Sequence, residues 1–370
     1  MRFKRTIYSI VLVLCLFVTG VLPGPAFTAV GEGYGMVYAA KAMTVRDDMR
    51  GIWLSYNDYS ALGLMDADES TYIKKVDSFL DKASDYDINA VFLHVRAFDD
   101  AIWKSKTFPA SAYMTSKASR NRSAANTYSY DPLADFIEVA SDYDIEVHAW
   151  MNPYRISATM FLDPAKSANQ NRVKKAIKEL AKYNIAGIHF DDYFYHSQGG
   201  YVKNYKSEKL YARDITPEKK RANVNKLVKS VYKLCHKKGL IFGISPQGNY
   251  DNDMNSGADV QTWLTKHKYV DYLVPQIYWT DQYGTDSNVT MFSDRLNQFN
   301  GLRTNGVQMY VGLALYRCGF DFSYDHGWIK SKKNMKTQIT KAKNLGWGGF
   351  IMFSAANLYN SESAKERSYL

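Results

Sequence analysis

The run Gly187-Ile188-His189-Phe190-Asp191-Asp192-Tyr193-Phe194-Tyr195-His196 places two adjacent carboxylates at the end of a buried strand. Ile188 and Phe190 alternate with His189 and Asp191, as side chains on the two faces of a β-strand do. A carboxylate is costly to bury at such a position unless it is paired or used in chemistry. The run therefore predicts an active site that begins where a strand ends.

Seven further segments share this strand character and alternate with amphipathic segments whose apolar residues have helical spacing. The eight predicted strands are 50–56, 89–98, 146–153, 187–193, 240–248, 270–279, 308–316 and 348–355. Strand–helix alternation predicts parallel strands, and eight such units predict an α/β fold of the (β/α)₈ TIM-barrel type in a single domain. A doubly wound open sheet is the competing fold, but no glycine-rich phosphate turn follows the first strand. The long segments 99–130 and 194–217 follow strands and are predicted as loops of the catalytic rim.

The N-terminus has a different character. Arg2, Lys4 and Arg5 precede the apolar run 7–22, and a proline–glycine break and small residues follow. This layout is typical of a secretory signal, with an uncleaved membrane anchor as the alternative. We therefore predict a signal peptide and short linker over 1–42, a barrel over 43–370, and a secreted or cell-envelope-associated, extracytoplasmic location.

The formal net charge of +10 limits the possible partners. The lysines fall mostly on predicted helices, where solvated faces account for them, and no nucleic-acid-binding module accompanies them. We expect no nucleic-acid partner, although a basic secreted protein can associate with an anionic cell surface. The sequence leaves the oligomeric state open.

The predicted strand ends are rich in aromatic, amide and charged residues, and this is where the site of such a barrel lies. Aromatic faces stack on sugar rings, whereas amide, guanidinium and carboxylate groups hydrogen-bond to hydroxyls, so the pattern favours carbohydrate over simple rim packing. The predicted substrate-binding residues are Arg96, Asp99, His148, Asn152, Arg155, His189, Tyr193, Gln247, Gln276, Tyr278 and Trp279.

Glycoside cleavage usually needs two carboxyl groups. No glutamate lies at the end of a predicted strand, and only Glu208, in the loop after the fourth strand, is placed to reach the site. We therefore predict Asp191 and Asp192 as the catalytic residues. Because strand residues alternate in direction, Asp191 is expected to enter the barrel mouth, and Asp192 to turn into the rim or pair with Arg96 or Arg155.

A metal site is the rival chemistry. His94, His148, His189, Asp191 and Asp192 are residue types that bind zinc, which leaves metal-dependent carbohydrate deacetylation as an alternative. No His-x-x-x-His or Cys-x-x-Cys spacing supports it, and no nucleotide-binding or phosphate-loop motif is present. We predict neither a metal nor a cofactor.

A set of motifs in fixed order resembles the family-10 glycosyl-hydrolase-like proteins, which are secreted bacterial (β/α)₈ barrels. The motifs are Arg50-Gly51-Ile52-Trp53, Asp131-Pro132-Leu133, His148 to Arg155, Gly187 to Tyr195, Arg221 to Asn225, Gly243-Ile244-Ser245-Pro246 and Asp271 to Trp279. The resemblance implies hydrolysis of O-glycosidic bonds in a poly- or oligosaccharide, such as the cell-envelope glycan peptidoglycan. A non-catalytic glycan-binding barrel is the alternative. The chain departs from the family pattern at Gln247-Gly248 and His196-Ser197, which border the predicted site.

Overall fold

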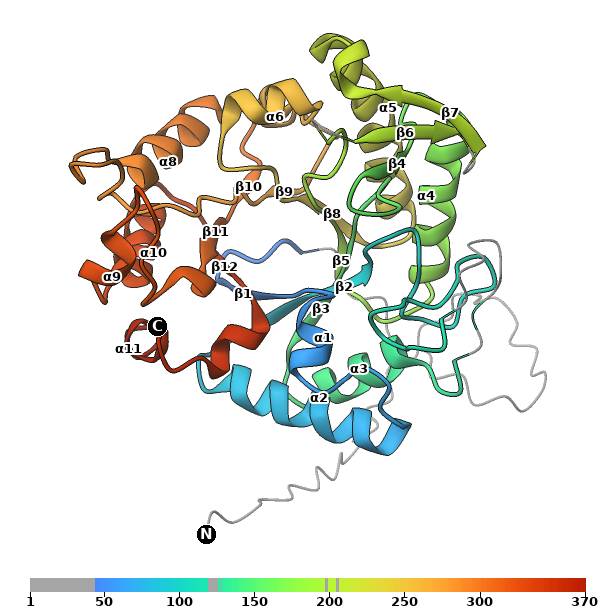
Figure 1. The fold of residues 1–370 in the computed structure, drawn as a ribbon, viewed down its shortest axis with the longest axis horizontal. Coiled ribbons are helices and arrows are strands. Elements are labelled where there is room, and N and C mark those ends of the chain that lie inside the picture. Colours follow the sequence, from blue (N-terminus) through green and yellow to red (C-terminus); the bar gives the residue numbers. More distant parts are fainter. Residues whose placement is uncertain (1–43, 119–125, 127, 197–198, 204–205) are drawn as a thin grey trace, which may run out of the picture. The chain divides into compact units, whose positions relative to one another are not determined.

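The computed structural model describes residues 44–118, 126, 128–196, 199–203 and 206–370 (Figure 1). The predicted signal segment lies outside these residues and stays a prediction. Within the described part, parallel strands occupy the centre and helices surround them (Figure 1).

The central sheet is a barrel of parallel strands in the order β10-β9-β8-β5-β3-β2-β1-β12-β11. The strands are β1 (Met49–Leu54), β2 (Ala90–Arg96), β3 (Glu146–Met151), β5 (Gly187–Phe190), β8 (Ile241–Ile244), β9 (Tyr272–Leu273), β10 (Gln308–Met309), β11 (Val311–Ala314) and β12 (Gly349–Phe353). β10 and β11 are consecutive pieces of one strand: β10 pairs with β9, β11 pairs with β12, and a bridge between Gln276 and Gly312 joins the same two sides. The eight predicted strands and the predicted TIM barrel are therefore confirmed.

Helices follow the strands and cover the barrel. They are α1 (Asp58–Ala61), α2 (Glu69–Ser84), α3 (Pro132–Ser141), α4 (Ser167–Leu180), α5 (Pro217–Lys237), α6 (Tyr250–Ser256), α7 (Val260–Thr265), α8 (Met291–Leu302), α9 (Gly327–Lys330), α10 (Asn334–Asn344) and α11 (Ala364–Arg367), with 3₁₀ turns η1 (Ala212–Asp214), η2 (Leu315–Arg317) and η3 (Ala355–Tyr359). Local sequence explains the start of α5: the Thr216 side chain accepts a hydrogen bond from the Lys219 N–H, and Pro217 occupies the first turn. None of the helices in the described ranges is both long and apolar enough to cross a membrane.

A second, three-stranded sheet lies beside α4 and α5 (Figure 1). It consists of β4 (Met160–Leu162), β6 (Gly200–Lys203) and β7 (Lys206–Tyr211), with β6 in the middle. The sequence predicted only a loop over 194–217, because these short strands have no clear hydrophobic alternation. The segment after the fourth barrel strand is thus held on a folded support.

Aromatic side chains fill the barrel interior and form a buried cluster separate from the larger core between strands and helices. The Tyr272 ring lies against Gly243 on the neighbouring strand β8, where a Cβ atom would fall 2.1 Å from the ring. Glycine is needed at this position because any side chain would occupy the space of the ring.

We predict that Gly243→Ala destabilises the protein by about 1–3 kcal/mol or more, because the added methyl group overpacks the interior. Gly301→Ala is the matched control: nothing lies within 4 Å of a Cβ there, and the residue is helical. The control is expected to be neutral or stabilising by up to about 1 kcal/mol. Chemical denaturation measures both, and an equal free energy of unfolding for the two variants would contradict this account of the interior.

Candidate functional site

The site is centred on a pair of hydrogen-bonded carboxyl groups. Strand β5 ends at Phe190, and Asp191 and Asp192 follow it directly. Their side chains are hydrogen-bonded to each other, and the Asp192 backbone N–H donates to Asp191 Oδ1 at 2.8 Å. Of the two alternatives predicted for Asp192, pairing with Arg96 or Arg155 is wrong, because no ion pair joins it to either arginine in the described part of the structure. The side chain lines the central pocket and one adjoining cavity. Strand alternation no longer applies beyond the last strand residue, so both carboxyl groups turn to the same place.

Neighbouring groups fix Asp191 in position. The Gln276 amide nitrogen donates to Asp191 Oδ1 at 3.1 Å and to the Ser245 carbonyl at 3.1 Å, which uses both of its hydrogens. Burial raises the pKa of Asp191, against the opposing effect of its hydrogen bonds and the Arg155 charge. Burial, and then the charge of Asp191, raise the pKa of Asp192 well above its usual range. The pair therefore holds a proton at a pH where isolated aspartates are ionised.

A third buried acid, Asp253, lies near this pair on α6. Burial, and then the charge of Asp192, raise its pKa well above the usual range. Its carboxylate accepts the Gln247 backbone N–H at 2.9 Å. Asp253 is not among the predicted site residues, because the prediction rests on strand ends and this residue lies on a helix.

The carboxyl pair lines a central pocket of about 240 Å³. Of the predicted binding residues, Arg155, Tyr193, Gln276 and Tyr278 line it too. The Arg155 guanidinium lies 4.3 Å from the ring centre of Tyr193 and 4.7 Å from that of Phe98. Seven residues not predicted as binding residues also contribute, namely Ser55, Tyr56, Asn57, His94, Trp150, Tyr316 and Phe353. Asp191 and Asp192 are the only carboxylic acids among the described residues of this lining.

The wall from β2 and β3 carries polar atoms without partners. The His94 ring stacks on Trp150, with centres 3.7 Å apart and planes at 14°. Among the described residues, neither His94 ring nitrogen, nor the Trp150 indole nitrogen, nor Arg155 Nε has a hydrogen-bond partner, and all four atoms are buried. Burial lowers the pKa of His94 well below its usual range, so the ring is neutral. Buried polar atoms without partners are rare, and these four belong to residues that line the central pocket.

Two further cavities adjoin the central pocket. One of about 400 Å³ shares Tyr56 and Arg155 with it, and another of about 370 Å³ shares Asp192 and Tyr193. The second also contains the predicted binding residue Gln247. The carboxyl pair thus lies between two spaces that can receive neighbouring units of a chain-like ligand.

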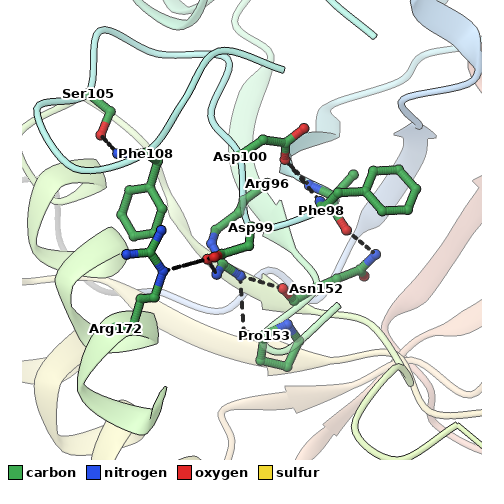
Figure 2. A network of polar contacts seen from close by, with 10 residues as sticks. Arg96, Phe98, Asp99, Asp100, Ser105, Phe108, Asn152, Pro153 and Arg172 are labelled. Carbon is green, nitrogen blue, oxygen red and sulfur yellow. Dashed lines mark hydrogen bonds and ion pairs between the residues drawn. The ribbon is translucent and has the colours of Figure 1, made fainter. Parts of the chain in front are cut away.

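Arg96, Asp99 and Asn152 have a structural role instead of the predicted one in binding. Each is fully buried, and an ion pair joins Arg96 to Asp99 (Figure 2). Asp99 also accepts two hydrogen bonds of 2.9 Å from Arg172 on α4, and Arg96 donates to the backbone carbonyls of Asn152 and Pro153 at 2.6 and 3.1 Å (Figure 2). The network ties the end of β2 to the end of β3 and to α4, so these side chains do not reach the pocket.

The predicted histidines also lie elsewhere. His148 and His189 are fully buried in the barrel interior and do not line the pocket. The Trp53 indole N–H, which can only donate, points at His189 Nε2 over 3.2 Å, so His189 donates through Nδ1 to the Tyr272 hydroxyl at 3.1 Å. Binding by these two histidines is therefore a wrong prediction.

Trp279 and Glu208 are the other two residues that the sequence placed near the site. Trp279 is half-buried near Gly248 and does not line the central pocket. The Glu208 side chain lies outside the described part of the structure. No group of three or more His, Cys, Asp or Glu residues in the described ranges has an arrangement that could hold a metal ion, so the metal-dependent alternative finds no ligand set there.

Comparisons with known proteins identify the family of the chain. The family model for glycosyl hydrolase-like 10 matches residues 48–160 and 154–330. The glycosyl hydrolase DigH of Escherichia coli K12 is 25% identical over 87% of this chain and 85% of its own length. The glycosyl hydrolase YngK of Bacillus subtilis is 27% identical over 83% and 68%.

Solved structures share the fold. The glycoside hydrolase domain of PgaB (BpsB) from Bordetella bronchiseptica has a TM-score of 0.56 at 10% identity, covering 87% of this chain and 98% of that one. A Group IV chitinase from Ostrinia furnacalis has a TM-score of 0.52 at 10% identity, with the same coverage. At such low identity these two likenesses establish the barrel alone.

The raised pKa values predict how stability depends on pH. An acid whose pKa is higher in the folded than in the unfolded state binds its proton more tightly when folded, so stability falls as pH rises from the unfolded value of about 4 through the folded one. We expect Asp192→Asn to lose less stability than wild type between about pH 5 and pH 8, because one carboxyl group with a raised pKa is gone.

Urea denaturation at several pH values measures this difference. Asp47→Asn, at an exposed position, is the control for the change in net charge and should follow wild type. Parallel pH profiles for Asp192→Asn and wild type would show that the carboxyl pair does not hold an extra proton.

Proposed function

Because the chain belongs to the glycosyl hydrolase-like 10 family, we propose that it is a secreted glycoside hydrolase that cleaves O-glycosidic bonds of a cell-envelope glycan such as peptidoglycan. The observation that carries the proposal is the pair of adjacent carboxyl groups, Asp191 and Asp192, in the lining of a pocket that also contains several aromatic rings. Burial raises the pKa values of both groups. The N-terminal signal pattern supports the extracytoplasmic location.

The pair supplies the acid that glycoside cleavage requires. A carboxyl group that remains protonated near neutral pH can donate its proton to the glycosidic oxygen as the bond from that oxygen to the anomeric carbon breaks. Water then adds to the anomeric carbon and returns a proton to the pair. Two carboxyl groups that are hydrogen-bonded to each other cannot lie on opposite faces of a sugar ring. The separated acid and nucleophile of a typical retaining glycosidase do lie on opposite faces. Asp191 and Asp192 therefore act as one proton-donating unit, with Gln276 fixing its orientation.

The unpartnered polar atoms explain how the sugar is held. His94, Trp150 and Arg155 present N–H groups, and the neutral imidazole adds one acceptor nitrogen. Small shifts of these side chains on binding would bring the buried nitrogens into reach of sugar hydroxyl or amide oxygens, which would complete these hydrogen bonds. The rings of Tyr193 and Tyr278 offer faces for the C–H side of the sugar.

Asp191→Asn is expected to lower the rate of glycan cleavage by about 10²–10⁴-fold and leave glycan binding in place, because general acid catalysis contributes about that much. The assay follows new reducing ends released from purified peptidoglycan glycan strands and from chitin oligosaccharides. Wild-type cleavage should also decline as pH rises through the raised pKa of the pair, because the proton is then lost.

The outcome against the proposal is equally clear. A wild type that binds these glycans but releases no reducing ends, at any pH where it is folded, would establish the non-catalytic glycan-binding barrel instead. Asp47→Asn serves as the active control, since its side chain lies on the surface.

His94→Phe is expected to raise the KM by about 5–10-fold, because the variant keeps the stacked ring but loses hydrogen bonds worth about 1 kcal/mol each. Steady-state kinetics with the same glycans measure this change, and circular dichroism checks the fold. A KM equal to that of wild type would show that the unpartnered nitrogens do not contact the substrate.

A further inference from the structure

Lys220 is a buried cation without an acidic partner. It lies in the first turn of α5, its side chain is 9% exposed, and its Cβ is 3.1 Å from where a Cβ of Gly257 would be. Its ammonium group donates one hydrogen bond, of 3.2 Å, to the Asn255 carbonyl. No carboxylate of the described residues lies within ion-pair distance of it, and burial lowers its pKa.

Such a group is costly unless it has a further role. An ammonium carries three N–H donors, and a buried charge normally has a counter-ion. The single contact with the end of α6 does not account for Lys220, because Arg221 already donates to the neighbouring Met254 carbonyl at 2.8 Å from a more exposed position. Lys219, the preceding residue on the same helix, keeps its side chain in solvent.

The lysine lines the cavity of about 370 Å³ that adjoins the carboxyl pair at Asp192 and Tyr193. Arg213 adds a second positive charge at this cavity, and its side chain is 81% exposed. The amides of Gln247, Asn252 and Asn255 also line it. Arg213 lies 3.8 Å from Asp214, and Asp192 is the one acid among the described lining residues, so the two cations outnumber the acids of the lining. The cavity is also rich in hydrogen-bonding groups, and its volume lies within the range of small-ligand sites.

We propose that this cavity is a subsite for a sugar unit that carries a carboxylate, and that Lys220 binds this carboxylate while the adjoining glycosidic bond lies at Asp191 and Asp192. The proposal rests on the proposed function, because it assigns the substrate an acidic sugar on one side of the cleaved bond. The incoming carboxylate supplies the counter-ion that the protein itself does not, and Arg213 attracts it at the cavity entrance.

The test compares wild type, Lys220→Gln and the matched control Lys219→Gln, which removes the same charge from the adjacent exposed position. Each cleaves peptidoglycan glycan strands with free carboxylates, and the same strands after carbodiimide coupling to methylamine has made the carboxylates neutral amides. Wild type and control are expected to show a kcat/KM about 10–100-fold higher on the free carboxylates, as a hydrogen-bonded charge provides. Lys220→Gln should lose this preference.

The remaining outcomes are decisive as well. If wild type cleaves both preparations equally, or if Lys220→Gln keeps the preference, the acidic subsite is refuted while the hydrolase function stands. If wild type cleaves neither preparation, the proposed activity on this glycan is refuted. The subsite is then tested separately, by measuring the binding affinity of Asp191→Asn for both preparations by calorimetry. Tighter binding of the free carboxylates that Lys220→Gln abolishes would support the subsite, and equal binding of both preparations would refute it.

Discussion

The polar ends of the rings inside the barrel must find partners there, because water does not reach them. One level of the interior meets this demand: Trp53 donates to His189, which donates to Tyr272, and the Ser245 hydroxyl lies 3.1 Å from the same histidine. This closed set of contacts fixes neutral side chains across β1, β5, β8 and β9. The strand ends are rigid because the rings below them are fully satisfied.

At the pocket, some buried ring nitrogens have no hydrogen-bond partner among the described residues. This difference distinguishes the candidate site from the barrel interior that supports it. His94 and Trp150 stack tightly but leave their nitrogens without partners among the described residues. Nearby, burial raises the pKa values of Asp191, Asp192 and Asp253. The charge of Asp191 adds to the rise for Asp192, and the charge of Asp192 adds to the rise for Asp253, at a cost in stability above the pKa of ordinary aspartates. Buried donors without partners and neighbouring acids with raised pKa values are features that gather at functional sites.

The sequence predicted the barrel and the position of Asp191, Gln276 and Tyr278, because parallel strands bring their carboxyl ends to one edge. It did not distinguish residues that face the pocket from residues that face another element. Asp99 follows a strand as Asp191 does, yet it pairs with Arg172 from a helix far along the chain. Among three strand histidines only His94 reaches the pocket, because depth in the barrel depends on stagger between strands. Asp253 and Lys220 lie on helices, and helical residues near the barrel mouth carry no strand-end pattern that would predict them.

The shared walls of the three cavities have a thermodynamic consequence. Arg155 belongs to both the central pocket and the cavity beside Tyr113, and Tyr193 belongs to both the central pocket and the cavity beside Lys220. The Arg155 guanidinium rests on the Tyr193 ring, so ordering one of these side chains also orders the other. A ligand in one outer cavity thus orders side chains that the neighbouring cavities share, and this lowers the conformational-entropy cost of filling those neighbours. Affinity then rises with the length of the bound chain more steeply than independent contacts would allow.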